Sequence, residues 1–115
     1  MYKALRISPM IPSFNMKETA AFFIDILGFS KYMYEEGYII LYKEEVSVHI
    51  LNAGDIGEME FYLEVDNVDA LWENKKDQLS GLKVRAPFDR EYGMREMHII
   101  IPQTKTLLFV GQAIK

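Results

Sequence analysis

Hydrophobic and polar positions alternate with the short period of strands along most of the chain, and a helical spacing interrupts this alternation twice. The opening segment, 4–14, alternates loosely and contains Pro9 and Pro12, so we expect an irregular edge strand there. Three runs rich in Tyr, Ile and Val follow within residues 29–51 and predict a meander of antiparallel strands. Residues 52–58 hold turn-forming and acidic residues and predict a surface connection.

The two helical stretches divide the strands into two similar groups. Asn15 can cap a helix with Glu18 three residues later, and apolar residues then follow at helical spacing. Gly28 can end this helix, which is predicted over residues 16–27. In the second half we expect a strand at 59–65, a helix capped at Asp66, and strands at 83–88, 94–101 and 106–111.

Both halves therefore share one element order. The sequence predicts an α+β fold made of two tandem β-α-β-β-β modules, at about residues 4–51 and 59–112. Because 115 residues can enclose one core and leave little for a second, we expect a single domain over residues 1–115.

Composition narrows the possible partners. The net charge is −4, and the 13 basic residues are scattered rather than gathered in a stripe, so nucleic acid is not expected as a partner. The absence of Cys excludes disulfides and thiolate metal sites. No apolar run approaches the ~20 residues that span a bilayer, and the first residues lack the apolar stretch of a signal peptide. We therefore expect a cytoplasmic protein without a membrane partner.

Polar and aromatic side chains occupy the predicted strand faces that point away from the helices. His49 alternates with the apolar set of its strand, as do Glu60 and Tyr62 in the next strand. We expect these two faces to converge on a small-molecule site, because an aromatic surface with few polar groups suits such a site. The alternative is that Glu60, Tyr62 and Glu64 form a solvated face.

The second histidine, His98, shares a strand face with Glu96 rather than with Met97. Each histidine could be a binding residue or simply a packed or solvated side chain. Two His without any Cys exclude a Cys-His nucleophile, and neither the paired-His helix pattern of zinc proteases nor a Gly-rich phosphate loop is present.

Three segments resemble one known superfamily. Residues 11–23, closed by Leu27-Gly28-Phe29, resemble the opening of the vicinal-oxygen-chelate proteins, which include glyoxalase I, extradiol dioxygenases and bleomycin-resistance proteins. Residues 61–71 resemble the fifth strand and second helix of that superfamily, and residues 90–97 resemble the aromatic-Gly-x-Arg-Glu segment of its bleomycin-resistance branch. The resemblance implies curved mixed sheets that form a cleft, with the helices on the side of the sheets that points away from the cleft.

The resemblance also implies positions for metal ligands. The metal enzymes of the superfamily place them on the first, fourth, fifth and eighth strands, which fall near Ser8, His49, Glu60 and Leu108. Leu108 cannot bind a metal and Ser8 is a poor ligand, so the glyoxalase set is incomplete. This departure favours a metal-free protein that sequesters an organic ligand without catalytic residues.

Two other functions stay open at this point. The chain could be a glyoxalase- or dioxygenase-like enzyme in which His49 and Glu60 hold a divalent metal such as Ni, Zn or Mn, with Glu64 or a partner-chain group completing the set. It could also be an interaction subunit whose cleft is filled by its own side chains.

For the binding protein, the resemblance implies a homodimer with clefts at the subunit junction. The acidic net charge modestly favours a cationic ligand. Arg95 could orient the ligand or only pair with a neighbouring carboxylate. The expected ligand-binding residues are His49, Glu60, Tyr62, Tyr92, Arg95 and His98.

Overall fold

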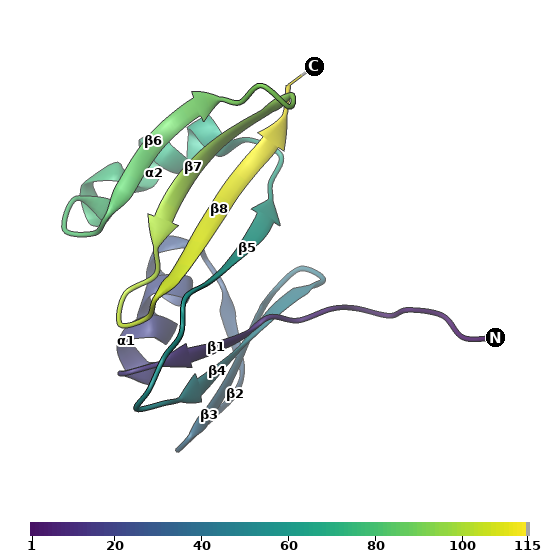
Figure 1. Ribbon diagram of the computed structural model, residues 1–115, viewed down its shortest axis with the longest axis vertical. Coiled ribbons are helices and arrows are strands. Elements are labelled where there is room, and N and C mark those ends of the chain that lie inside the picture. The colour runs from purple at the N-terminus through teal and green to yellow at the C-terminus, as the bar shows by residue number, and fades with distance from the viewer. Residues whose placement is uncertain (115) are drawn as a thin grey trace. The chain divides into compact units, whose positions relative to one another are not determined.

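The structure, a computed structural model, describes residues 1–114 and contains eight strands, two α-helices and one π-helical turn. The chain divides into two compact units, Met1–Ile56 and Gly57–Lys115, and each unit contains a four-stranded sheet and a helix (Figure 1). The predicted α+β class and the β-α-β-β-β order of both halves are confirmed. None of the helices within residues 1–114 is long and apolar enough to cross a membrane.

The first unit forms a mixed sheet in the order β1-β4-β3-β2. Its elements are β1 (Met10–Ser13), α1 (Met16–Ala21), the π-helical turn η1 (Phe22–Ile26), β2 (Ser30–Glu35), β3 (Tyr38–Lys43) and β4 (Val46–Asn52). Strand β1 pairs in parallel with β4, and the other neighbours are antiparallel. The predicted cap of α1 is present, because the Asn15 side chain accepts a hydrogen bond from the Glu18 N–H at 3.2 Å.

Two expectations for the first unit need correction. The first strand begins at Met10 instead of residue 4, and its ladder with β4 covers only Met10–Ser13. Pro9 lies just before it, has no N–H to donate, and contributes only its carbonyl, which accepts from the His49 N–H at 2.9 Å. The single helix predicted over 16–27 changes from α to π geometry at Phe22, a change that hydrophobic spacing does not reveal.

The second unit repeats this arrangement with the sheet order β5-β8-β7-β6. Its elements are β5 (Met59–Glu64), α2 (Val68–Leu79), β6 (Val84–Asp89), β7 (Met94–Ile100) and β8 (Thr106–Ala113). Strand β5 is parallel to β8, and β7 is antiparallel to both β6 and β8. The helix cap is Asn67 rather than the predicted Asp66, since the Asn67 side chain accepts from the Ala70 N–H at 3.0 Å.

Each helix covers one face of the sheet in its own unit. Helix α1 packs against β3 and β4, and α2 packs against β6, β7 and β8. The covered faces consist of fully buried apolar side chains, among them Ile50 in the first unit and Met97, Ile99 and Leu108 in the second. Because side chains alternate along a strand, the residues between them point to the opposite face. We call this opposite face the outer face of each sheet.

Candidate ligand-binding face

The outer face of the second sheet carries a row of four side chains that stand opposite one another on four neighbouring strands. Arg85 on β6 pairs with His98 on β7, His98 pairs with Phe109 on β8, and Phe109 pairs with Tyr62 on β5. Cross-strand partners share a face, so the row spans the whole width of the sheet. We call these four residues the aromatic row.

The rings of the aromatic row contact one another. The Tyr62 and Phe109 rings are stacked at 19° with centroids 6.1 Å apart, and the His98 and Phe109 centroids lie 4.4 Å apart. Phe88 extends the surface at the β6 side, with its centroid 5.2 Å from that of His98. Tyr62 remains 40% exposed. The sheet thus presents a partly exposed aromatic surface, the kind that accepts a flat organic molecule.

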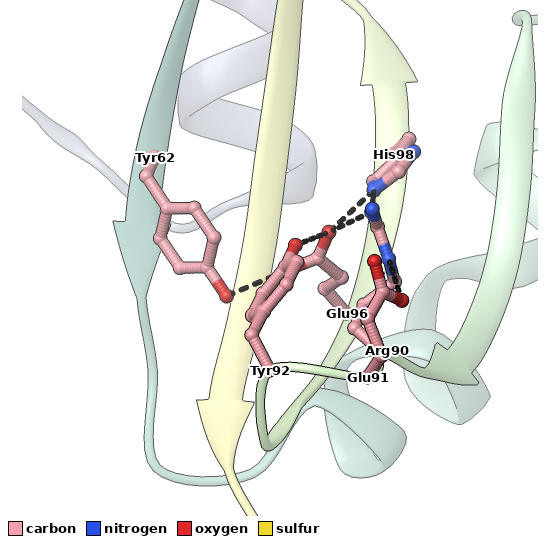
Figure 2. A network of polar contacts seen from close by, with 6 residues as sticks. All are labelled: Tyr62, Arg90, Glu91, Tyr92, Glu96 and His98. Atoms are coloured by element: carbon pink, nitrogen blue, oxygen red, sulfur yellow. Dashed lines mark hydrogen bonds and ion pairs between the residues drawn. The ribbon is translucent and has the colours of Figure 1, made fainter.

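A buried carboxylate contacts two side chains of the aromatic row, those of Tyr62 and His98 (Figure 2). Glu96 is fully buried, and its Oε2 accepts a hydrogen bond from the Tyr62 hydroxyl at 2.9 Å. Its Oε1 accepts from the Tyr92 hydroxyl at 2.6 Å and from Arg90 at 2.7 Å. The His98 Nε2 also lies 2.7 Å from Oε1, and it must donate because an ionised carboxylate only accepts. Four donors therefore satisfy one buried charge.

Electrostatics favour the ionised form of Glu96. Burial opposes ionisation, but the hydrogen bonds from Tyr92, His98 and Tyr62 and the charge of Arg90 outweigh it and lower the pKa of the carboxyl. The contacts with Glu96 raise the pKa values of the two tyrosine donors. Burial and the hydrogen bond to Glu96 raise the pKa of Tyr62, and the hydrogen bond to Glu96 raises the pKa of Tyr92.

Local backbone geometry makes this cluster possible. Arg90 and Tyr92 lie in the hairpin between β6 and β7, where Gly93 adopts a left-handed conformation with φ +85°. The Tyr62 side chain reaches Glu96 across β8 at Gly111, the cross-strand partner of Glu96. A Cβ at position 111 would lie 2.0 Å from the Tyr62 hydroxyl oxygen, so only glycine leaves room for this crossing.

The outer face of the first sheet forms a separate cleft of about 830 Å³. Its lining includes Tyr32, Tyr42 and His49. The Tyr38 hydroxyl lies 2.6 Å from the Nδ1 atom of His49 and fixes the ring. This cleft contains aromatic side chains, but no row of ring contacts crosses the first sheet within residues 1–114.

The structure brings together three of the six predicted binding residues. Tyr62, Tyr92 and His98 meet at Glu96, whereas His49 belongs to the first unit. Glu60 is exposed on β5, on the same face as Tyr62 and opposite Leu107.

The remaining predicted residue, Arg95, makes ion pairs away from the aromatic row. Its guanidinium contacts Asp69 at 3.0 Å and Asp89 at 2.9 Å. These contacts agree with the ion-pair alternative for this residue. Its side chain alternates with those of Glu96 and Met94 along β7, so it does not share the face of the aromatic row.

Sequence reasoning did not assign binding roles to several residues of this face. Glu96 and Arg90 lie inside the segment 90–97 that carries the superfamily resemblance, so the sequence does contain a signal that points to these two residues. Phe109 and Arg85 enter the face only through cross-strand register, which a single sequence does not supply.

The residues at the superfamily's metal positions offer an incomplete ligand set. The Ser8 hydroxyl is hydrogen-bonded to that of Ser47. Tyr38 contacts His49 at Nδ1, which leaves Nε2 as the atom available to a metal. The eighth-strand residue beside Glu60 is Leu107 rather than Leu108, which is fully buried on the helix side. Among residues 1–114 no cluster of three His, Cys, Asp or Glu side chains could hold a metal ion.

The same fold occurs in solved structures of known proteins. No family model matches the chain, and no curated protein matches it in sequence. Among solved structures, a bleomycin resistance determinant encoded on the transposon Tn5 is 21% identical, with a TM-score of 0.79 over 94% of this chain and 97% of that chain. A bleomycin-binding protein from Streptomyces verticillus, complexed with copper(II)-bleomycin, is 20% identical, with a TM-score of 0.79 over 100% of both chains.

An enzyme shares the same architecture. A lactoylglutathione lyase from Agrobacterium tumefaciens is 13% identical, with a TM-score of 0.79 over 96% of this chain and 94% of that chain. The architecture therefore occurs both in proteins that bind a drug and in enzymes. The chain has the fold that these bleomycin-binding proteins and this lactoylglutathione lyase share.

Proposed function

We propose that this protein binds a planar organic ligand on the outer face of its second sheet and releases it unchanged, without a metal. The observation that carries the proposal is the aromatic row, because it places three rings and a guanidinium side by side across four strands. Aromatic faces attract flat, apolar molecules, and the few polar groups around them orient a ligand.

The chemistry of Glu96 supports binding over catalysis. A general base works best when its pKa lies near the operating pH and a lone pair can reach the substrate. The pKa of Glu96 is instead lowered, and four donors already occupy its oxygens. We infer that Glu96 is a positioning residue, which fixes the orientations of Tyr62 and His98 so that a ligand meets a preorganised surface.

The solved structures support the same proposal without deciding it. Two of the similar structures are described by a bleomycin-resistance or bleomycin-binding role, and this chain spans nearly their whole length. The lyase has the same fold, so fold alone does not separate binding from enzymatic activity. The incomplete ligand set, with Ser8 bonded to Ser47 and Leu107 beside Glu60, favours the binding protein over the metal-dependent alternative.

We further propose that the protein works as a homodimer. Several large apolar side chains of the first unit are strongly exposed, among them Leu5 (89%), Ile7 (94%) and Tyr32 (75%). Exposed apolar surface favours association with another protein surface. Sedimentation equilibrium should give twice the chain mass of 13.4 kDa, and a monomer at micromolar concentration would reject this part of the proposal.

A thermal-shift screen of planar aromatic compounds on chelator-treated protein tests the binding function. Compounds that raise the melting temperature are then titrated against Phe109→Leu, which removes a ring from the aromatic row but keeps an apolar side chain. The lost ring contact is worth about 0.5–1.5 kcal/mol, which corresponds to an affinity weaker by up to roughly tenfold. Tyr34→Leu removes an exposed ring from the first unit, outside the residues named for the dimer, and serves as the matched control.

Two results would contradict the proposal. Stabilisation that appears only after a divalent metal is added would favour the metal-dependent enzyme. Equal affinities of Phe109→Leu and the unchanged protein would show that the ligand binds elsewhere.

A further inference from the structure

We propose that the ligand is an aromatic anion, a planar ring system with a carboxylate that binds at Arg85. This inference rests on the proposed function, because it uses the same face and names the chemical class that the face selects. It differs from the expectation drawn from net charge, which favoured a cation.

Arg85 differs from the other arginines of the second unit because it has no carboxylate partner among residues 1–114. Arg90 pairs with Glu96 and Glu91, and Arg95 pairs with two aspartates. No ion pair is formed by Arg85 within residues 1–114; its guanidinium carbon lies 3.6 Å from the centroid of the Phe88 ring. Stacking on this ring holds the guanidinium plane while its N–H groups stay available to an anion.

The charges on the face are arranged so that its β6 side is positive. The charge of Glu96 is buried and is compensated by Arg90. The other carboxylates of this face, Glu60 and Glu64, lie on β5, three strands away from β6 in the sheet. Neighbouring strands are about 4.8 Å apart, so this separation is roughly 14 Å. A carboxylate at Arg85 therefore meets an uncompensated cation and is far from both acidic side chains.

The register places this cation beside the rings. Arg85 is the cross-strand partner of His98, and the His98 and Phe109 rings are 4.4 Å apart. A ring stacked over His98 and Phe109 would direct a substituent on its β6 side toward Arg85. Guanidinium and carboxylate match as a planar pair with two parallel hydrogen bonds, which gives direction as well as affinity.

Three naphthalene probes that share one ring system and differ in one substituent test the inference by isothermal titration: the carboxylate, the methanol and the methylammonium derivatives. We expect the carboxylate to bind at least tenfold more tightly than the alcohol, and the ammonium probe to bind most weakly. Arg85→Gln should weaken carboxylate binding to the level of the alcohol and leave alcohol binding unchanged. Arg6→Gln, which removes one positive charge from the first unit, should change none of the affinities.

The outcomes separate this inference from the proposed function. If the alcohol or the ammonium probe binds as tightly as the carboxylate, and Phe109→Leu weakens that binding, the anion preference is wrong and the binding face stands. If Arg85→Gln retains the preference for the carboxylate, another cation selects it and the assignment to Arg85 is wrong. If none of the three probes binds, both the inference and the binding face are rejected.

Discussion

Replacement of Gly111 by alanine is the sharpest structural test of the aromatic row. The new Cβ would lie 2.0 Å from the Tyr62 hydroxyl oxygen and 2.9 Å from its Cζ, so the ring would have to leave its hydrogen bond with Glu96. No positive φ is required at this position, so alanine itself fits the local backbone.

The expected cost follows from the contacts that are lost and gained. A hydrogen bond to a charged group contributes about 1.5–3 kcal/mol, and we take about 1–2 kcal/mol here because Tyr62 is 40% exposed. Alanine returns about 0.4–1 kcal/mol by restricting the unfolded chain. We therefore expect Gly111→Ala to lower the free energy of unfolding by roughly 1 kcal/mol.

A double-mutant cycle isolates the role of Tyr62. In a Tyr62→Ala background the new Cβ meets only the Glu96 Cβ, at 3.0 Å, which a small shift relieves. Gly111→Ala should then keep the gain of about 0.4–1 kcal/mol, so the coupling energy between the two positions equals the lost hydrogen bond, about 1–2 kcal/mol. The coupling energy is measured by urea unfolding, which is monitored through the fluorescence of Trp72. This is the only tryptophan of the sequence, and it lies in α2 of the second unit. An equal cost of Gly111→Ala in both backgrounds would refute the reasoning.

The same cluster predicts two pH dependences and one metal result. The pKa of Glu96 is lowered, so its contribution to stability is present above its ordinary pKa of 4.5 and is lost as the pH falls. The difference in unfolding free energy between the unchanged protein and Glu96→Gln should therefore shrink in acid. Because the pKa of Tyr62 is raised from 10.0, its contribution is present below that pH, and the advantage over Tyr62→Phe should fade at higher pH. Urea titrations across pH measure both, and pH-independent differences would contradict them. Isothermal titration of chelator-treated protein with nickel, zinc and manganese should show no tight site, whereas one ion per chain that disappears in His49→Ala would restore the metal-dependent enzyme.

Much of the fold follows from local sequence signals. Period-two alternation or a short apolar run marks the strands, and short polar side chains mark the helix caps, so the element order of both units can be predicted. The signals fail where two residues are equally suitable. The side chains of Asp66 and Asn67 are both able to accept a cap hydrogen bond, and only the structure shows that Asn67 is the one that does so. The change from α to π geometry at Phe22 leaves the residue pattern unaltered.

Alternation of side chains also predicted part of the site. Along β7 it placed His98 on the same face as Glu96, and the two side chains are in contact. Strand β8 is apolar on both faces, so alternation could not show whether Leu107 or Leu108 lies beside Glu60. Arg90 comes from a hairpin, where no periodicity applies, and its contact with Glu96 depends on the local turn.

The most direct test of the central claim is to map a bound aromatic probe by amide chemical shifts. Chelator-treated, uniformly nitrogen-labelled protein is titrated with the naphthalene carboxylate while the amide spectrum is recorded. We predict saturable shifts concentrated at the aromatic row, at Arg85, His98, Phe109 and Tyr62. Shifts confined to the first unit, or binding that requires an added metal, would contradict the account.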